Sequence, residues 1–481
     1  MPYVGRSTDK ISNVEVLDNI TFDGSSSYTL QKNSVNFTPS SANTLLLSID
    51  GVVQAGNFTV SGSTIDFGTA VAGTSTCDFV LHYGVGLITA PSDGTVTEAK
   101  IGTGAVTEAK IGTGAVTSAK LASGTVQNQS AFKNIIINGD MSIAQRGTSA
   151  TGLGDGDSGY HTVDRWKFNE SGTPTYEFTM TQDTDVPSGQ GFAKSMKLAC
   201  TTAQTSLGTD NNLRFMTILE GQNLQYLKFG TSNAESLTLS FWVKSNKTGD
   251  YSVALYNGDT VDIITRTITI NSANTWEKKT LTFSGDTGNN FSNDNGASLY
   301  LWINLLTGTD YNTSSAVNWT SYSSGRLAYG QTVNLADSTS NYINITGVQL
   351  EAGTSASDFE FLPFDINQRR CQRYYYRVNP TNLSAAPIGT AIYYSSSAVF
   401  TQVPFPITMR AAPTLEQVTG TNYFNVNRNA DNDFFDAFEL SNAGTESTTL
   451  YVSSGLSATS GDAGRTRFAN TSARLAFVSE L

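Results

Sequence analysis

The stretch GTVTEAKIGTGAVTEAKIGTGAVTSAKLASGTV, residues 94–126, has a ten-residue period and an apolar residue at every fifth position. A five-residue spacing fits neither the 3.6-residue period of a helix nor the two-residue alternation of a half-buried strand. The remaining positions are small, polar or charged, so one copy of the segment has no core of its own. The recurring apolar residues are Val96, Ile101, Val106, Ile111, Val116, Leu121 and Val126.

These side chains need a partner surface, and the simplest partner is the same segment in other copies of the chain. The repeat therefore predicts the thin stalk of a homo-oligomeric fibre, on the order of 100 Å long at about 3.3 Å per residue. Two alternatives stay open. A flexible Gly/Ala/Thr linker has a similar composition, although linkers rarely keep register through several copies. A pentapeptide β-helix has a similar spacing, although so few pentads make a weak solenoid.

Composition points to a β-rich protein with several domains. The 481 residues are too many for one core, only 15% of them are charged, and 43 are glycines. The net charge of −12 argues against nucleic acid as a partner. The three cysteines are far apart, no signal-like apolar segment opens the chain, and no apolar run reaches 18 residues. We therefore expect no disulfide framework, no membrane insertion, and folding in a reducing cytoplasm.

Outward from the repeat, short alternating segments separated by Gly/Ser turns predict β-domains on both sides. The predicted fold class is all-β, with four parts. Residues 1–88 form a small N-terminal β-domain and 89–130 the repeat stalk. Residues 131–365, with about ten strand candidates beginning at 134–137, predict a jelly-roll-like β-sandwich. Residues 366–481 predict a C-terminal β tip domain that opens with a short helix entering a strand.

Several motifs resemble those of bacteriophage tail fibres, as carried by marine short-tailed phages. In the N-terminal part these are the initial MPYVG and LLLSIDGVVQAGNFTVSGSTIDF (45–67). In the sandwich they are NIIINGDMSIAQRG (134–147), HTVDRW (161–166), LTLSFWVKS (237–245), TWEKKTLTF (275–283) and GVQLEAGTSASDFEFLP (347–363), which resemble a carbohydrate-binding-module-like sandwich. CQRYY (371–375), FPITMRAAPT (405–414) and the final RLAFVSEL complete the set.

This resemblance implies a homotrimer that is part of the virion and is assembled in the host cytoplasm. Its residues 1–88 would bind a tail adaptor or nozzle protein. Its distal domains would bind a host surface polysaccharide or an outer-membrane receptor. Residues 415–470 match no motif of such fibres, which is expected if they carry variable receptor specificity.

The residues give little support for catalysis. The only histidines, His82 and His161, stand in no nucleophile or metal motif, so we expect structural roles for both. A glycosidase needs only two carboxylates, which leaves a tailspike-type polysaccharide depolymerase as the alternative function. Enzymatic tailspikes usually contain a long β-helix, and 131–481 lacks its 20–25-residue period. We expect a binding protein with no catalytic residues.

The segment GLGDGDSGYH (152–161) has the D-x-D-x-G spacing of a short calcium loop. Calcium requires more oxygen ligands than the local Asp155 and Asp157 supply. A structural calcium ion is therefore a weak hypothesis beside a solvated turn, and no other cofactor is expected.

Aromatic residues on polar strand faces are the stronger binding signal. Alternation places Trp242 in LTLSFWVKS, and Tyr300 and Trp302 in SLYLWINL, opposite the apolar faces of their strands. The loop 309–323 adds Tyr311, Trp319 and Tyr322. Sugar C–H faces pack on aromatic rings, so these residues predict a glycan groove. A subunit interface and a second buried layer are the alternatives.

In the tip, residues 423–438 are expected to form a loop that contacts the receptor. Its candidate residues are Tyr423, Arg428, Asp431, Asp433, Phe434 and Phe435. Arginines also interleave with tyrosines over 369–377. In an acidic chain this pattern favours ion pairs across copies over nucleic-acid binding.

Overall fold

The computed structural model describes residues 11–86, 101–103, 105–107, 110–111, 132–379, 381, 383–429 and 431–481. The chain divides into two compact units, 1–128 and 129–481. The described strands pair antiparallel, and α1 (Phe364–Gln372) is the only α-helix among the described residues. The predicted all-β class is confirmed. No described helix has both the length and the apolar character needed to span a bilayer.

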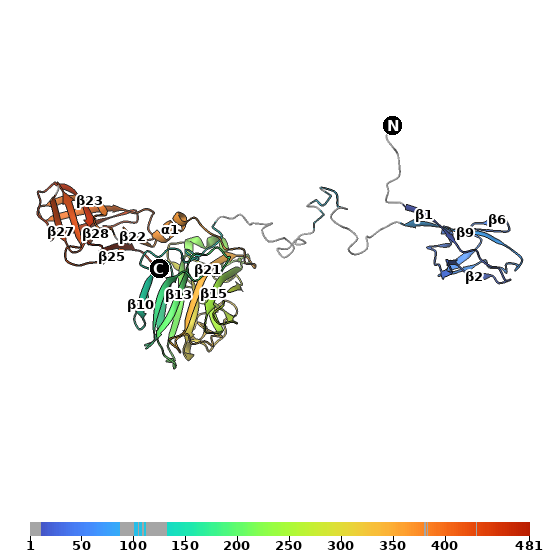
Figure 1. The fold of residues 1–481 in the computed structure, drawn as a ribbon, viewed down its shortest axis with the longest axis horizontal. Helices are drawn as coiled ribbons and strands as arrows, with labels where there is room; N and C mark the ends of the chain where they lie inside the picture. The colour runs from blue at the N-terminus through green and yellow to red at the C-terminus, as the bar shows by residue number, and fades with distance from the viewer. Residues whose placement is uncertain are drawn as a thin grey trace, which may run out of the picture. The chain divides into compact units, whose positions relative to one another are not determined.

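The first unit consists of three small sheets around one core (Figure 1). A four-stranded sheet has the order β1 (Ile11–Leu17), β9 (Cys77–Gly86), β5 (Leu45–Ile49), β6 (Val52–Gln54). The others are β2 (Ser27–Thr29), β8 (Thr64–Asp66), β7 (Thr59–Ser61), and the pair β3 (Gln31–Lys32), β4 (Val35–Asn36); η1 (Ala42–Thr44) precedes β5. Leu17, Leu47, Ile65 and Val80 lie in their shared core. The predicted stalk residues Val96, Val116, Leu121 and Val126 lie outside the described residues.

The second unit begins with two six-stranded sheets packed face to face. Sheet one has the order β10 (Ser149–Leu153), β12 (Glu177–Asp183), β13 (Ser195–Thr202), β21 (Tyr342–Ala352), β15 (Leu237–Ser245), β18 (Glu277–Phe283) (Figure 1). Sheet two has the order β11 (Lys167–Ser171), β14 (Asn212–Glu220), β19 (Ala297–Thr307), β16 (Gly249–Asn257), β17 (Asp262–Ile270), β20 (Thr320–Ser321). Short 3-10 turns are η5 (Gly221–Asn223), η6 (Gln225–Leu227), η7 (Thr309–Tyr311) and η8 (Ser324–Arg326).

Alternation explains which side chains the sandwich buries. On β15, Leu239, Phe241 and Val243 point into the core between the sheets, and on β19 Leu301 and Ile303 do the same. On each inner face, a row of branched and aromatic side chains is buried away from water. This burial is the main favourable contribution to the free energy of folding.

The C-terminal part of this unit contains α1 and two further sheets. A three-stranded sheet has the order β22 (Tyr375–Val378), β31 (Arg474–Val478), β25 (Thr414–Val418). A seven-stranded sheet has the order β27 (Asp431–Phe435), β26 (Phe424–Arg428), β30 (Ala463–Phe468), β23 (Pro387–Ser395), β24 (Ala398–Pro404), β29 (Ser447–Val452), β28 (Glu439–Ala443). Tyr393, Phe424 and Leu450 lie in the core beneath it.

Two local expectations are wrong. Residues 134–137 form no strand, because Asn134 and Glu360 bind the backbone of this buried segment through side chains. Residues 424–435 are not a loop but the hairpin β26–β27. Within the sandwich, strands β10, β14 and β20 have no counterpart among the strand candidates expected from the sequence. Nearly every position of β14 is buried, so it lacks the alternation that marks a half-exposed strand.

Candidate functional site

The predicted aromatic groove on the sandwich is covered. Tyr300 and Trp302 do lie on the outer face of sheet two, where Trp302 stacks on Tyr256 with ring centroids 4.8 Å apart. Residues 309–329 pack over this face, and the buried Leu327 and Ala328 belong to the same cluster. Only 6% of Trp302 is exposed. This region is the second buried layer that the sequence left as an alternative, and Trp302 presents no open surface to a sugar.

The other predicted aromatic residues do not converge on one groove. Tyr311 and Tyr322 are half-buried in the layer over Trp302. Trp319 packs instead against Phe229, 5.8 Å between ring centroids, and donates a hydrogen bond to the carbonyl of Ser284 at 2.7 Å. Trp242 is half-buried on the outer face of sheet one, which is the opposite side of the sandwich.

The weak calcium hypothesis gains no support from the geometry. Asp157 Oδ2 accepts the backbone N–H of Gly154 at 3.0 Å, which closes a turn within the segment. The N–H of Gly156 donates to Glu170, and His161 Nε2 contacts the carbonyl of Asp157 at 2.7 Å. Among the described residues, His, Cys, Asp and Glu form no group of three that could hold a metal ion.

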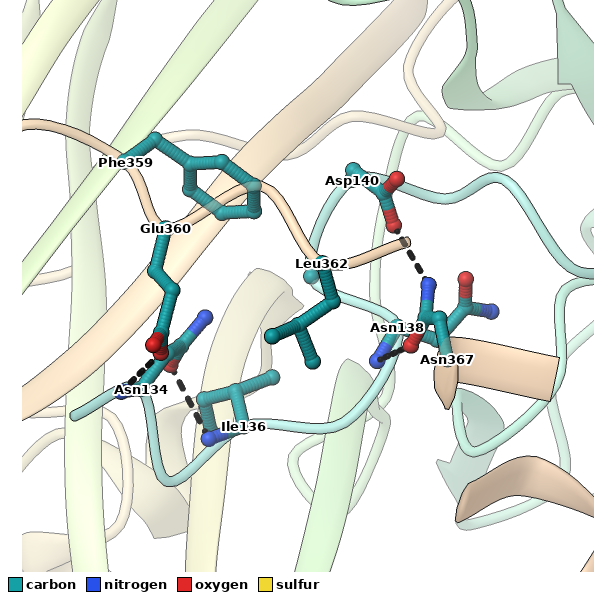
Figure 2. A pocket seen from close by; sticks show the side chains of 9 residues that line it. Asn134, Ile136, Asn138, Asp140, Phe359, Glu360, Leu362 and Asn367 are labelled. Atoms are coloured by element: carbon teal, nitrogen blue, oxygen red, sulfur yellow. Dashed lines mark hydrogen bonds between the residues drawn. The ribbon is translucent and has the colours of Figure 1, made fainter. Parts of the chain in front are cut away.

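Several motif residues meet at a joint between the sandwich and α1 (Figure 2). Glu360 Oε2 accepts the N–H of Asn134 at 2.9 Å, and Asn134 Oδ1 accepts the N–H of Ile136 at 3.0 Å. Asn367, on α1, accepts the N–H of Asn138 at 3.2 Å and donates to Asp140 at 3.0 Å. The remaining gap of about 10 Å³ has room for about one water molecule. This joint is structural.

Ion pairs extend the joint to the C-terminal part of the chain. Arg373 donates two hydrogen bonds of 2.7 Å to Glu220, whose side chain is fully buried. Burial alone would raise the pKa of Glu220, but the bonds from Arg373 and Tyr374 outweigh it and lower that pKa. Glu480 pairs with Arg165 and, at 3.2 Å, with Arg146. The prediction that Arg373 pairs across copies is therefore wrong, because its partner is in its own chain.

A cavity of about 400 Å³ lies beside this joint. Its walls include the half-exposed rings of Phe132 and Tyr226, the side chain of Ile407, and Arg370. The guanidinium of Arg370 lies 5.9 Å from the ring of Phe132.

The predicted tip residues separate into internal and exposed groups. Phe435 is buried in the core and Tyr423 is half-buried against it. Asp433 accepts a hydrogen bond from the Tyr393 hydroxyl and pairs with Arg428 at 3.3 Å, so these side chains hold the hairpin to the sheet. Asp431 is exposed at the turn. Phe434 points outward from the sheet, 43% exposed.

The outer face of the seven-stranded sheet, hereafter the tip face, has the features of a binding surface. One half of it is aromatic. Tyr394, 73% exposed, contacts Phe400 with ring centroids 5.7 Å apart, and Phe400 lies 5.2 Å from Tyr451. Ile392 pairs with Phe400 across β23 and β24 and is 57% exposed. Alternation places Ala391 and Tyr393 in the core and leaves these side chains on the outside.

The other half of the tip face carries amides and guanidinium groups. Arg467 Nη2 donates to Asn432 at 2.6 Å, and Asn425 and Asn427 each donate to the same oxygen at 3.1 Å. Burial and the neighbouring charge of Arg465 lower the pKa of Arg467, which stays charged. In the described part of the chain, the exposed Arg465 has no hydrogen-bond or ion-pair partner.

A row of uncharged polar side chains joins the two halves. Thr390, Gln402 and Thr449 lie opposite one another on β23, β24 and β29. The tip face therefore offers rings for C–H packing, amides and hydroxyls for hydrogen bonds, and two guanidinium groups for a carboxylate or phosphate. The tip face was not predicted from the sequence, although the segment TAIYY (390–394) has apolar residues on both faces of its strand.

Comparisons with known proteins find no matching family model and no matching curated protein. The solved structures that resemble part of this chain do so with low sequence identity and with TM-scores well below 0.5. A domain of bacteriophage CBA120 tailspike protein 4, described as enzymatically active, is 14% identical with a TM-score of 0.26, covering 46% of this chain and 21% of that one. A family 11 carbohydrate-binding module from Clostridium thermocellum, in complex with a mixed-linked tetrasaccharide, is 10% identical with a TM-score of 0.22 over 44% and 98%. A xylan-binding domain from Paenibacillus barcinonensis is 13% identical with a TM-score of 0.19 over 43% and 94%.

Proposed function

We propose that this chain is a tail fibre protein of a bacteriophage, a non-enzymatic homotrimeric adhesin whose tip face binds an acidic glycan on the host surface. The observation that carries the binding role is the tip face itself. It places an exposed aromatic group beside two arginines on one side of one sheet. The tail-fibre motifs, from the N-terminal domain to CQRYY and RLAFVSEL, support the virion role and attachment through residues 1–88.

The local charge of the tip face favours an acidic ligand. The chain as a whole has a net charge of −12, whereas this face presents two neighbouring arginines, Arg465 and Arg467. Arginine forms paired hydrogen bonds with carboxylates and phosphates, which occur on capsular polysaccharides and lipopolysaccharides. The adjacent tyrosine and phenylalanine rings would pack on the pyranose faces.

The deeply buried carboxylates support a binding protein over a depolymerase. Glu220 and Glu480 are each paired with arginine, and the pairs hold the joint together. Asp164 accepts hydrogen bonds from the backbone and side chain of Gln145, although burial raises its pKa to about 6.

The test is binding of the full chain to a panel of acidic and neutral bacterial polysaccharides. We expect binding to acidic members, weakened by salt. Tyr394→Ala and Arg465→Ala should each reduce affinity by roughly tenfold or more, on the order of 1.4 kcal/mol. The controls are Tyr226→Ala and Arg369→Ala, which remove an exposed tyrosine and an exposed arginine elsewhere in the same unit. Equal losses in test and control variants would contradict the proposal, and released oligosaccharides would favour the depolymerase.

A further inference from the structure

The four-stranded sheet of the first unit has one face that its own domain covers. Leu17 on β1, Leu47 on β5 and Val80 on β9 point from this face into the core. Because side chains alternate along each strand, the residues between them point to the other face of the sheet.

That other face is apolar rather than polar. Strand register places Val14 opposite Tyr83, and Val16 opposite Leu81. On β5, Leu46 lies opposite Leu81 and so extends this second pair into a row across three strands. In the next row, Phe79 and Val53 lie on either side of Ser48. We call this surface the N-terminal strip, made of Val14, Val16, Leu46, Val53, Phe79, Leu81 and Tyr83.

The strip is open in the isolated chain. Val16 is 65% exposed, Val53 51% and Val14 50%, and Tyr83 is exposed as well. Antiparallel sheets that face water normally carry polar residues on the outer side. A contiguous apolar surface of this kind marks a protein interface.

Connectivity indicates which protein covers it. β9 supplies the centre of the strip and ends at Gly86, only eight residues before the repeat begins at Gly94. In the described part of the repeat, the side chains of Ile101, Val106 and Ile111 are exposed in the same way. Eight residues span at most about 26 Å at 3.3 Å per residue, so a repeat shared by several copies would hold their strips close together. Tethering at this distance gives an effective concentration in the millimolar range.

We propose that the N-terminal strip is a self-association surface, on which strips of neighbouring copies cover one another beside the stalk. This rests on the proposed homotrimer and adds where its N-terminal domains meet. The first units of neighbouring copies would then form one joined N-terminal head. A tail protein would bind the outer surface of this head rather than the strip.

Adjacent residues of β6 provide a matched test. Val53 lies on the strip, whereas Val52 pairs with Ile49 on the opposite face and is 62% exposed. The native cysteines are buried, so the folded chain has a low background of thiol labelling. Val53→Cys and Val52→Cys are made in the full chain, and each is treated with maleimide and with a short bis-maleimide cross-linker. Val16→Cys and Val35→Cys, on β1 and β4, form a second pair if either β6 variant fails to fold.

In the assembled protein, Val53→Cys should react with maleimide at least tenfold more slowly than Val52→Cys and should be cross-linked between copies. Equal labelling of the two cysteines in a trimer of unchanged mass would overturn the proposal and leave the fibre intact. Protection that disappears when residues 1–10 are deleted would show instead that the chain covers its own strip. Protection only after a tail protein is added would also overturn it. Polysaccharide binding is measured on the same samples, so failure of the tip-face proposal is seen separately.

Discussion

At the scale of single residues, the pair of Glu220 and Arg373 links the sandwich to the segment that leads into the tip. The side chain of Glu220 is fully buried, whereas Arg373 retains some exposure. Removing one member of a buried pair leaves the other uncompensated. We expect Glu220→Gln to lower the free energy of unfolding at pH 7 by about 3 kcal/mol. Urea unfolding followed by tryptophan fluorescence measures this, since all five tryptophans lie in the sandwich.

The same pair has a defined pH dependence. The pKa of Glu220 is lowered from 4.5 in the folded chain, so its contribution is fully present above about pH 4.5. That contribution is lost as the pH falls through the folded pKa, and the stability gap between wild type and Glu220→Gln should narrow below pH 4.5. The raised pKa of Asp164 acts in both proteins and cancels in the comparison. Glu439→Gln, at an exposed position, is the control, and a gap that stays constant down to pH 3 would contradict the assignment.

At the scale of elements, residues 309–329 act as a cap over the outer face of sheet two. Leu327 is 2% exposed and belongs to the cluster that covers Trp302. Replacing a buried leucine by alanine leaves a cavity and costs about 2–5 kcal/mol. We expect Leu327→Ala to destabilise the sandwich by about 3 kcal/mol and to increase acrylamide quenching of tryptophan fluorescence.

The matched control lies in the same cap. Val317 is 56% exposed, and surface substitutions of this kind usually change stability by less than about 0.5 kcal/mol. If Leu327→Ala and Val317→Ala behave alike, the cap does not bury the aromatic layer as described.

These elements show what the sequence predicts and where it stops. The alternation of apolar and polar residues correctly predicted strands β15 and β19. It also predicted the face of the sheet to which Trp302 points. The same alternation could not predict the cap. A two-residue period shows to which face of the sheet a side chain points, but not which segment covers that face. Strand β14 was not predicted, because it is buried on both faces and its sequence therefore lacks the alternation of a half-exposed strand. The hairpin β26–β27 was expected to be a loop because its outward-pointing asparagines give it the composition of a turn. These are Asn425, Asn427 and Asn432.

The candidate site followed the same pattern. The sequence marked Phe434 in the tip and missed Tyr394 and Arg465, since no motif surrounds either residue. The tip face exists only because β30 pairs with both β23 and β26. Such pairing joins residues far apart in the chain, and strand register cannot be read from composition.

At the scale of the whole molecule, the repeat sets how many tip faces act together. Several weak glycan sites on one particle exceed the affinity of one site by 10²–10⁴ only when they engage together. Ile101, Val106 and Ile111 are exposed in the single chain, which is the state that assembly through the repeat would remove. Charges at these positions would be costly at a shared apolar axis but neutral in a solvated linker.

Substitution in the repeat therefore separates a stalk from a linker. We expect Val106→Asp with Ile111→Asp to reduce the mass in solution from about three times 51.4 kDa towards that of one chain. Binding to immobilised polysaccharide should fall by roughly 100-fold, since avidity is lost while each tip face is unchanged. Thr103→Asp with Thr107→Asp adds the same charge at polar positions and should leave both values unaltered. Light scattering gives the mass, and a trimer that tolerates both pairs of aspartates would show that the repeat is only a connector.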